Sequence, residues 1–179
     1  MSITQDALTV PEARCRIRET PHAMDRTFSG SHERSVDGKW RVSLPPEFRG
    51  GVDTDDRCVL GRVPGSPCLG LWRQKSFDAA YRRLEDEVRS QGTGQNLLRW
   101  FTGNGYPVKP DAQGRIVVPE PLRDVLGIDA DGPEARIFVA GVGERIELWN
   151  SEVWLETVGG AGAYTDETGL GPWSESSWL

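Results

Sequence analysis

Residues 37–49 read DGKWRVSLPPEFR, and residues 111–123 read DAQGRIVVPEPLR. The two stretches share an aspartate, a proline and two arginines at a constant offset of 74 residues, which indicates a duplicated unit. Further on, the Leu-Trp pair at 71–72 matches that at 148–149 with an offset of 77. The difference predicts a three-residue insertion in the second copy, in loop 127–133. The matched pairs are Asp37 and Asp111, Arg41 and Arg115, Pro45 and Pro119, and Arg49 and Arg123.

Each copy predicts the same order of elements: a strand, a polar turn opened by the aspartate, a second strand, a short helix and a β-hairpin. Alternation in the second strand places Val42 and Leu44 on one face, as it does Ile116 and Val118 in the second copy. Proline then ends the strand and opens a helix at 47–49 or 120–126, the longer of which stops at Gly127. The predicted strands are 33–36, 40–44, 57–62, 68–72, 106–109, 115–118, 135–140 and 145–149.

A helical linker is predicted between the copies, over residues 76–102. Ser76 is a plausible N-cap, and apolar residues follow at spacings of four, three and four, at Phe77, Tyr81, Leu84 and Val88. After a break at 92–94, a second short helix is predicted over 95–101.

A unit of about 45 residues is near the lower size limit for folding alone, so we expect the two copies to share one core. The predicted fold is mainly β with short helices (α+β), and both copies contribute strands to one small barrel. The expected segments are an N-terminal extension predicted to be disordered (1–27), repeat 1 (31–73), the helical linker (76–102), repeat 2 (105–149), the start of a C-terminal helix (150–158) and a flexible acidic tail (159–179).

The 179 residues carry a net charge of -6, which argues against a protein that coats nucleic acid through bulk positive charge. Three cysteines without CxxC spacing offer no zinc-finger pattern, and no apolar run is long enough to span a bilayer. We therefore expect a soluble, cytoplasmic protein. A nucleophile motif, a phosphate-binding glycine loop and metal-ligand spacing are all missing from the sequence. The chain is thus predicted not to be an enzyme, with no cofactor, catalytic or metal site, small-molecule substrate or membrane association.

The sequence resembles the MraZ family, whose members carry two repeats of the SpoVT-AbrB type. The resemblance spans about 130 residues and includes Phe28-x-Gly30, Asp37-x-Lys39-x-Arg41, Leu71-x-Arg73 and Asp111-x-Gln113-Gly114-Arg115. It implies two AbrB-like swapped-hairpin repeats, and a homo-oligomer that forms a ring. It also implies a sequence-specific, nucleoid-associated transcriptional regulator that binds double-stranded DNA at repeated promoter sites, including those of its own cell-division and cell-wall gene cluster.

The turns supply the candidate DNA-binding residues, which are Lys39 and Arg41 in the first copy and Gln113 and Arg115 in the second. Arginine binds phosphate or the O6 and N7 atoms of guanine, and glutamine pairs with adenine. Asp37 and Asp111 are expected to stabilise the turns; alternatively, each forms an internal ion pair with its arginine. Secondary candidates are Arg34, Arg49 and Arg123, for which the alternative is a solvated surface charge.

Family members usually have glycine before the first motif arginine, where this chain has Trp40. If that glycine requires positive φ, we expect Gly38 to supply the flexible point of the turn instead. Because few phosphate contacts per subunit cannot overcome the net charge, we expect oligomerisation to contribute to binding. Two rival functions are an AbrB-type antitoxin, which binds a toxin protein and its own operator, and a purely structural ring.

Overall fold

A computed structural model describes residues 27–52, 57–130 and 135–158. The predicted tail 159–179, and the predicted extension 1–27 apart from Thr27, lie outside the described residues. In chain order the elements are β1 (Ser31–Ser35), β2 (Arg41–Ser43), α1 (Pro46–Arg49), β3 (Cys58–Arg62), β4 (Cys68–Arg73), α2 (Gln74–Gln91), α3 (Gln95–Gly103), β5 (Gly105–Val108), β6 (Arg115–Val117), the 3₁₀ helix η1 (Glu120–Leu122), α4 (Arg123–Leu126), β7 (Arg136–Val142), β8 (Arg145–Asn150) and α5 (Ser151–Thr157).

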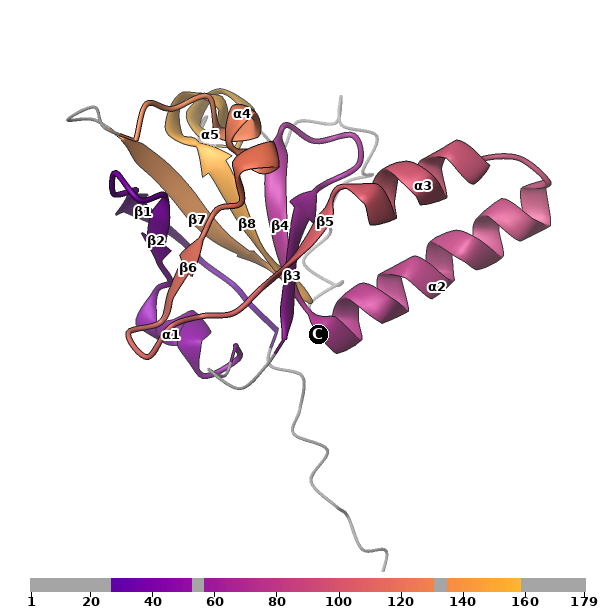
Figure 1. The fold of residues 1–179 in the computed structure, drawn as a ribbon, viewed down its shortest axis with the longest axis horizontal. Helices are drawn as coiled ribbons and strands as arrows, with labels where there is room; N and C mark the ends of the chain where they lie inside the picture. The colour runs from indigo at the N-terminus through magenta and orange to yellow at the C-terminus, as the bar shows by residue number, and fades with distance from the viewer. Residues whose placement is uncertain (1–26, 53–56, 131–134, 159–179) are drawn as a thin grey trace, which may run out of the picture.

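The strands form a small barrel from two antiparallel sheets (Figure 1). Six strands pair in the order β1-β7-β8-β4-β3-β5, and β2 pairs with β6 in a separate two-stranded ribbon. Tight turns connect β1 to β2 and β5 to β6, so the ribbon joins the two edge strands of the larger sheet. We call β2 and β6 together the ribbon below.

The two repeats are related by an internal two-fold axis. In the ribbon, Val42 pairs with Ile116, which is its own counterpart in the second copy. On the other side of the barrel, Gly70 of β4 pairs with its counterpart Glu147 of β8. The repeats also exchange strands, since β1 pairs with β7 and β5 with β3. These pairings confirm the expected fold of two swapped repeats that share one barrel.

The strand registers correct the predicted insertion. Cys58 pairs with Arg73 and Ile137 pairs with Asn150. Because Arg73 and Asn150 are equivalents 77 residues apart, Cys58 and Ile137, which are 79 apart, are also equivalents. The second copy is therefore longer by five residues before β7 and shorter by two in its hairpin turn. The sequence offset shows only the net difference of three.

The barrel interior is apolar, as the alternation in the second strands predicts. Val42, Leu44, Ile116 and Val118 are fully buried. A second aromatic cluster lies outside the barrel, where the helices cover the sheet. In it Phe77 of α2 stacks on Phe101 of α3, and the equivalent Trp154 of α5 stacks on Phe138.

The linker is a helical hairpin of α2 and α3 that projects from the barrel on the side opposite the ribbon (Figure 1). The break at 92–94 is present, with Gly92 at positive φ as the C-cap of α2. The predicted N-cap was wrong: α2 begins at Gln74 directly after β4, and Ser76 is buried inside its first turn. Within the described part of the chain, no helix is long and apolar enough to span a bilayer.

Candidate nucleic-acid interface

Each polar turn is built by its aspartate. Asp37 Oδ1 accepts hydrogen bonds from the backbone N–H groups of Lys39 and Arg41, both at 3.0 Å. In the second copy Asp111 Oδ1 accepts from the equivalent N–H groups of Gln113 and Arg115, both at 2.9 Å. One carboxylate oxygen thus satisfies two backbone donors of the turn, and the two turns have the same geometry.

The second carboxylate oxygen of each aspartate pairs with the motif arginine. Arg41 Nε donates to Asp37 Oδ2 at 2.7 Å, and Arg115 Nε donates to Asp111 Oδ2 at 2.8 Å. The ion pair considered as an alternative is therefore present in both turns. It does not bury the arginines, whose side chains remain 33% and 28% exposed.

These hydrogen bonds keep both carboxylates ionised. The Arg41 backbone N–H, assisted by its side chain, lowers the pKa of Asp37 below its ordinary value. The Arg115 side chain, followed by its backbone N–H, lowers the pKa of Asp111 in the same way. Each turn therefore carries a carboxylate that fixes its arginine, beside an exposed Lys39 or Gln113.

The residue before each arginine adopts the left-handed conformation, with φ of 58° at Trp40 and 71° at Gly114. Trp40 is the one non-glycine residue at positive φ in the part of the chain that the structure describes. The expectation that Gly38 would supply this conformation was wrong. The turn is fixed by three hydrogen bonds around Asp37, so its left-handed point stays at position 40 and the indole adopts it.

Arg49 and Arg123 brace the turns across the two-fold axis. Arg49 Nε donates to the Leu44 carbonyl at 2.9 Å, and its side chain lies against Gly114, where a Cβ would be 2.6 Å from Nε. Arg123 Nε donates to the Val118 carbonyl at 3.2 Å, and its guanidinium lies 4.9 Å from the centre of the Trp40 ring. Each repeat thus supports the turn of the other. The shared spacing from proline to arginine was the sequence signal for this pairing.

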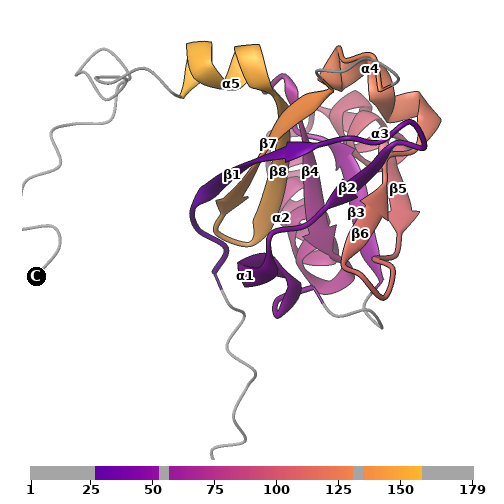
Figure 2. The ribbon, with the colours of Figure 1, turned by 90° about the vertical axis from the view of Figure 1, so that its left-hand side faces the viewer.

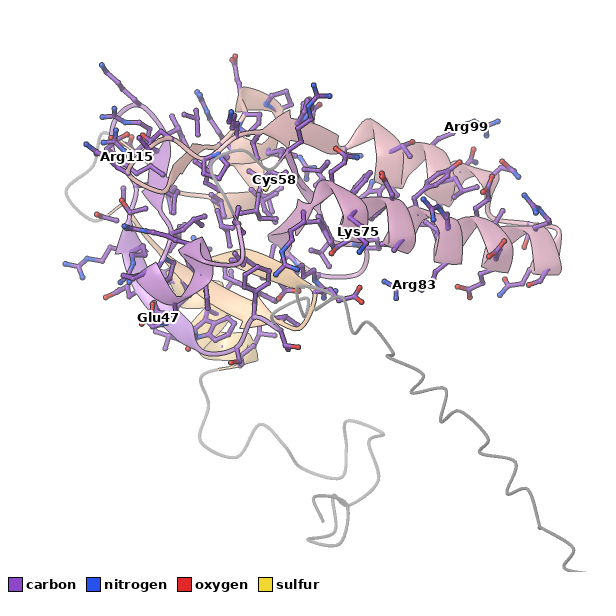
Figure 3. All side chains as sticks on the ribbon, turned by 90° about the horizontal axis from the view of Figure 1, so that it is seen from below. Glu47, Cys58, Lys75, Arg83, Arg99 and Arg115 are labelled. Atoms are coloured by element: carbon purple, nitrogen blue, oxygen red, sulfur yellow. The ribbon has the colours of Figure 1, made fainter. Side chains whose placement is uncertain are left out.

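The two turns lie at opposite ends of the ribbon, at the upper and lower right of Figure 2. Trp40 N–H and C=O mark one end and Leu44 and Gly114 the other, four residue steps or about 13 Å away. Figure 3 shows Arg115 at the end of the molecule away from Arg99. Arg34 is on β1, where its Nη1 donates to the Glu33 carbonyl at 2.9 Å. The structure thus brings the candidate residues of the two turns to one side of the barrel.

Among the described residues, no three His, Cys, Asp or Glu side chains are grouped closely enough to hold a metal ion. What the arrangement offers chemically is a rigid ribbon with a carboxylate-fixed arginine at each end. A duplicated swapped-hairpin barrel with a matched Asp–Arg turn in each repeat defines a protein of the two-repeat AbrB-like class.

Residues 27–99 and 101–158 match the family described as "MraZ protein, putative antitoxin-like". The chain belongs to the MraZ family. It is 31% identical to the transcriptional regulator MraZ of Marinomonas sp. over 71% of this chain and 82% of that protein. It is also 31% identical to that of Micrococcus luteus, over 71% and 83%, and 29% identical to that of Paenarthrobacter aurescens, over 79% and 93%.

The solution structure of PHS018 from Pyrococcus horikoshii aligns with 65% of this chain and 91% of its own, at 16% identity and a TM-score of 0.31. The sequence relatives carry the assignment. They are transcriptional regulators, a non-enzymatic class, which confirms that this chain is a transcriptional regulator and not an enzyme.

Proposed function

We propose that this protein binds duplex DNA sequence-specifically, at repeated sites in the promoter of its own cell-division and cell-wall gene cluster. The observation that carries the proposal is the pair of matched turns, each presenting an arginine fixed by an aspartate at one end of a single ribbon. Fixed donors suit base recognition because little side-chain entropy remains to be lost on binding.

Each turn offers complementary contacts. Asp37 and Asp111 hold Nε of their arginines, which leaves the outer guanidinium edge to approach phosphate or the O6 and N7 atoms of guanine. Lys39 offers a compact positive charge to phosphate, and Gln113 offers an amide to adenine. In this proposal Arg34, Arg49 and Arg123 are secondary phosphate contacts, and the latter two also support the turns.

The proposal includes a homo-oligomer, with a ring as the arrangement that presents equivalent turns to successive sites. A net charge of -6 opposes approach to DNA, and two turns per chain supply few phosphate contacts. In an oligomer the later contacts become intramolecular and gain effective concentration. The protein would then be located in the cytoplasm, associated with the nucleoid.

Fluorescence anisotropy with DNA from the region upstream of the protein's own coding sequence tests this function. Arg115→Ala and Arg41→Ala should weaken binding, by about 1–3 kcal/mol where a base contact is lost. Where a phosphate contact is lost, the slope of log affinity against log salt should fall by about 0.9. Arg99→Ala, on α3 away from the turns, is the control. Unchanged binding by both turn variants would refute the assignment, and an absence of DNA binding by the wild type would favour a structural ring.

The alternative is an AbrB-type antitoxin, which the family description favours. An antitoxin would relieve the growth arrest caused by expression of an adjacent toxin gene, whereas a dedicated regulator would not. Co-expression with each neighbouring gene distinguishes the two functions.

A further inference from the structure

The outward face of the ribbon carries residues that the turns do not explain. Strand alternation places Val42 and Ile116 inside the barrel, where both are fully buried. The flanking positions therefore face outward. They are Arg41 and Ser43 on β2, and Arg115 and Val117 on β6.

Val117 is unusual because it is an apolar side chain 48% exposed in the middle of this polar face. The other exposed large hydrophobic residues of the described chain belong to α3, α5 and its C-cap, and the end of β7. The two-fold axis relates Val117 to Ser43, which is half-buried. One repeat thus offers a hydroxyl where the other offers two methyl groups.

The strand register places Val117 between the arginines. Its backbone pairs with Arg41, and Ser43 pairs with Arg115, so each arginine has a cross-strand neighbour from the other repeat. The major groove of B-DNA is about 12 Å wide and admits a two-stranded ribbon. Arginines at both ends favour approach of this face to phosphates, and an apolar side chain between them then meets base edges.

We propose, on the basis of the proposed function, that the ribbon lies in the major groove and that Val117 contacts the C5-methyl group of a thymine. This methyl is the apolar group that distinguishes A·T pairs on their major-groove edge. Ser43 makes the equivalent contact in the first repeat with a hydroxyl, which accepts or donates a hydrogen bond. Because the two positions differ, a chain with near two-fold symmetry reads a site that has a direction.

The test replaces single thymines by uracil, which lacks the methyl group, in the shortest upstream fragment that the wild type binds. Wild-type affinity should fall about fourfold at one position, as expected for one buried methyl group. Val117→Ser should bind the thymine DNA about fourfold more weakly, without further loss on the uracil DNA and with an unchanged salt slope. Val142→Ser, which alters a valine of similar exposure on β7, should retain the uracil effect.

The inference is overturned if wild-type binding is insensitive to uracil at every position, or if Val117→Ser retains the sensitivity. It is also overturned if Val117→Ser changes the oligomer mass and leaves the uracil effect intact, since Val117 would then contact another subunit. Failure of the wild type to bind, or an Arg115→Ala variant that binds normally, overturns the proposed function itself. The two failures are therefore distinguishable.

Discussion

Replacing Gly114 by alanine tests the cross-repeat brace on the second turn. Gly114 has φ of 71°, and a Cβ there would be 2.6 Å from Arg49 Nε and 2.7 Å from Arg49 Cδ. The substitution therefore imposes a backbone cost and a steric cost. The alanine must adopt the left-handed conformation, and the Arg49 side chain must leave its position against the turn.

The two costs can be separated with a second glycine. Gly65 has nearly the same φ, 73°, and nothing within 4 Å of its Cβ position. Gly65→Ala should therefore cost only the left-handed conformation, roughly 1 kcal/mol. Gly114→Ala adds the loss of the bond from Arg49 Nε to the Leu44 carbonyl, worth about 1 kcal/mol. The expected total is about 2–3 kcal/mol.

Urea unfolding at one fixed protein concentration measures these free energies, because an oligomer's stability depends on concentration. In an Arg49→Ala background the steric cost disappears, so Gly114→Ala should cost roughly 1 kcal/mol there. Equal costs for Gly114→Ala with and without Arg49, or equal costs at positions 65 and 114, would refute the brace.

Further measurements test the turns and the core. NMR titration should give Asp37 and Asp111 carboxyl pKa values below 3.8; their stabilisation is then present above this pH and lost as pH falls through the lower, folded values. Burial raises the pKa of Cys68 to about 12, so Ellman's reagent should not label it in the native state at pH 8, and rapid labelling would contradict its burial. Ile116→Ala should cost about 2–5 kcal/mol in urea unfolding, against about 0.5 kcal/mol or less for Val142→Ala; similar costs would place Ile116 outside the core.

Much of the fold could be predicted because its determinants are local in the sequence. The alternation in each second strand identified the buried residues, and Gly127 ends α4 in the left-handed conformation as predicted. The start of α2 could not be predicted in this way, because β4 continues directly into it. The N–H of Gln74 donates to the Arg57 carbonyl of the adjacent strand instead of a side-chain cap.

The candidate site was predictable at its turns and not at its supports. Aspartate capping follows from short-range geometry, so the roles of Asp37 and Asp111 in the turns could be predicted from sequence. The left-handed Trp40 contradicts residue preference, and it is accommodated by hydrogen bonds around it and the Arg123 guanidinium over its ring. That contact joins residues 83 positions apart and depends on the two-fold axis, which only the folded barrel provides.

The exchange of strands between repeats has a consequence for biosynthesis. β1 is completed by β7, which emerges from the ribosome about 100 residues later. At about 5–20 residues per second, the amino-terminal half therefore waits on the order of 5–20 s with an unpaired strand edge. Productive folding thus begins only when translation is nearly finished, and chaperones that protect nascent β-edges should determine the yield of this protein.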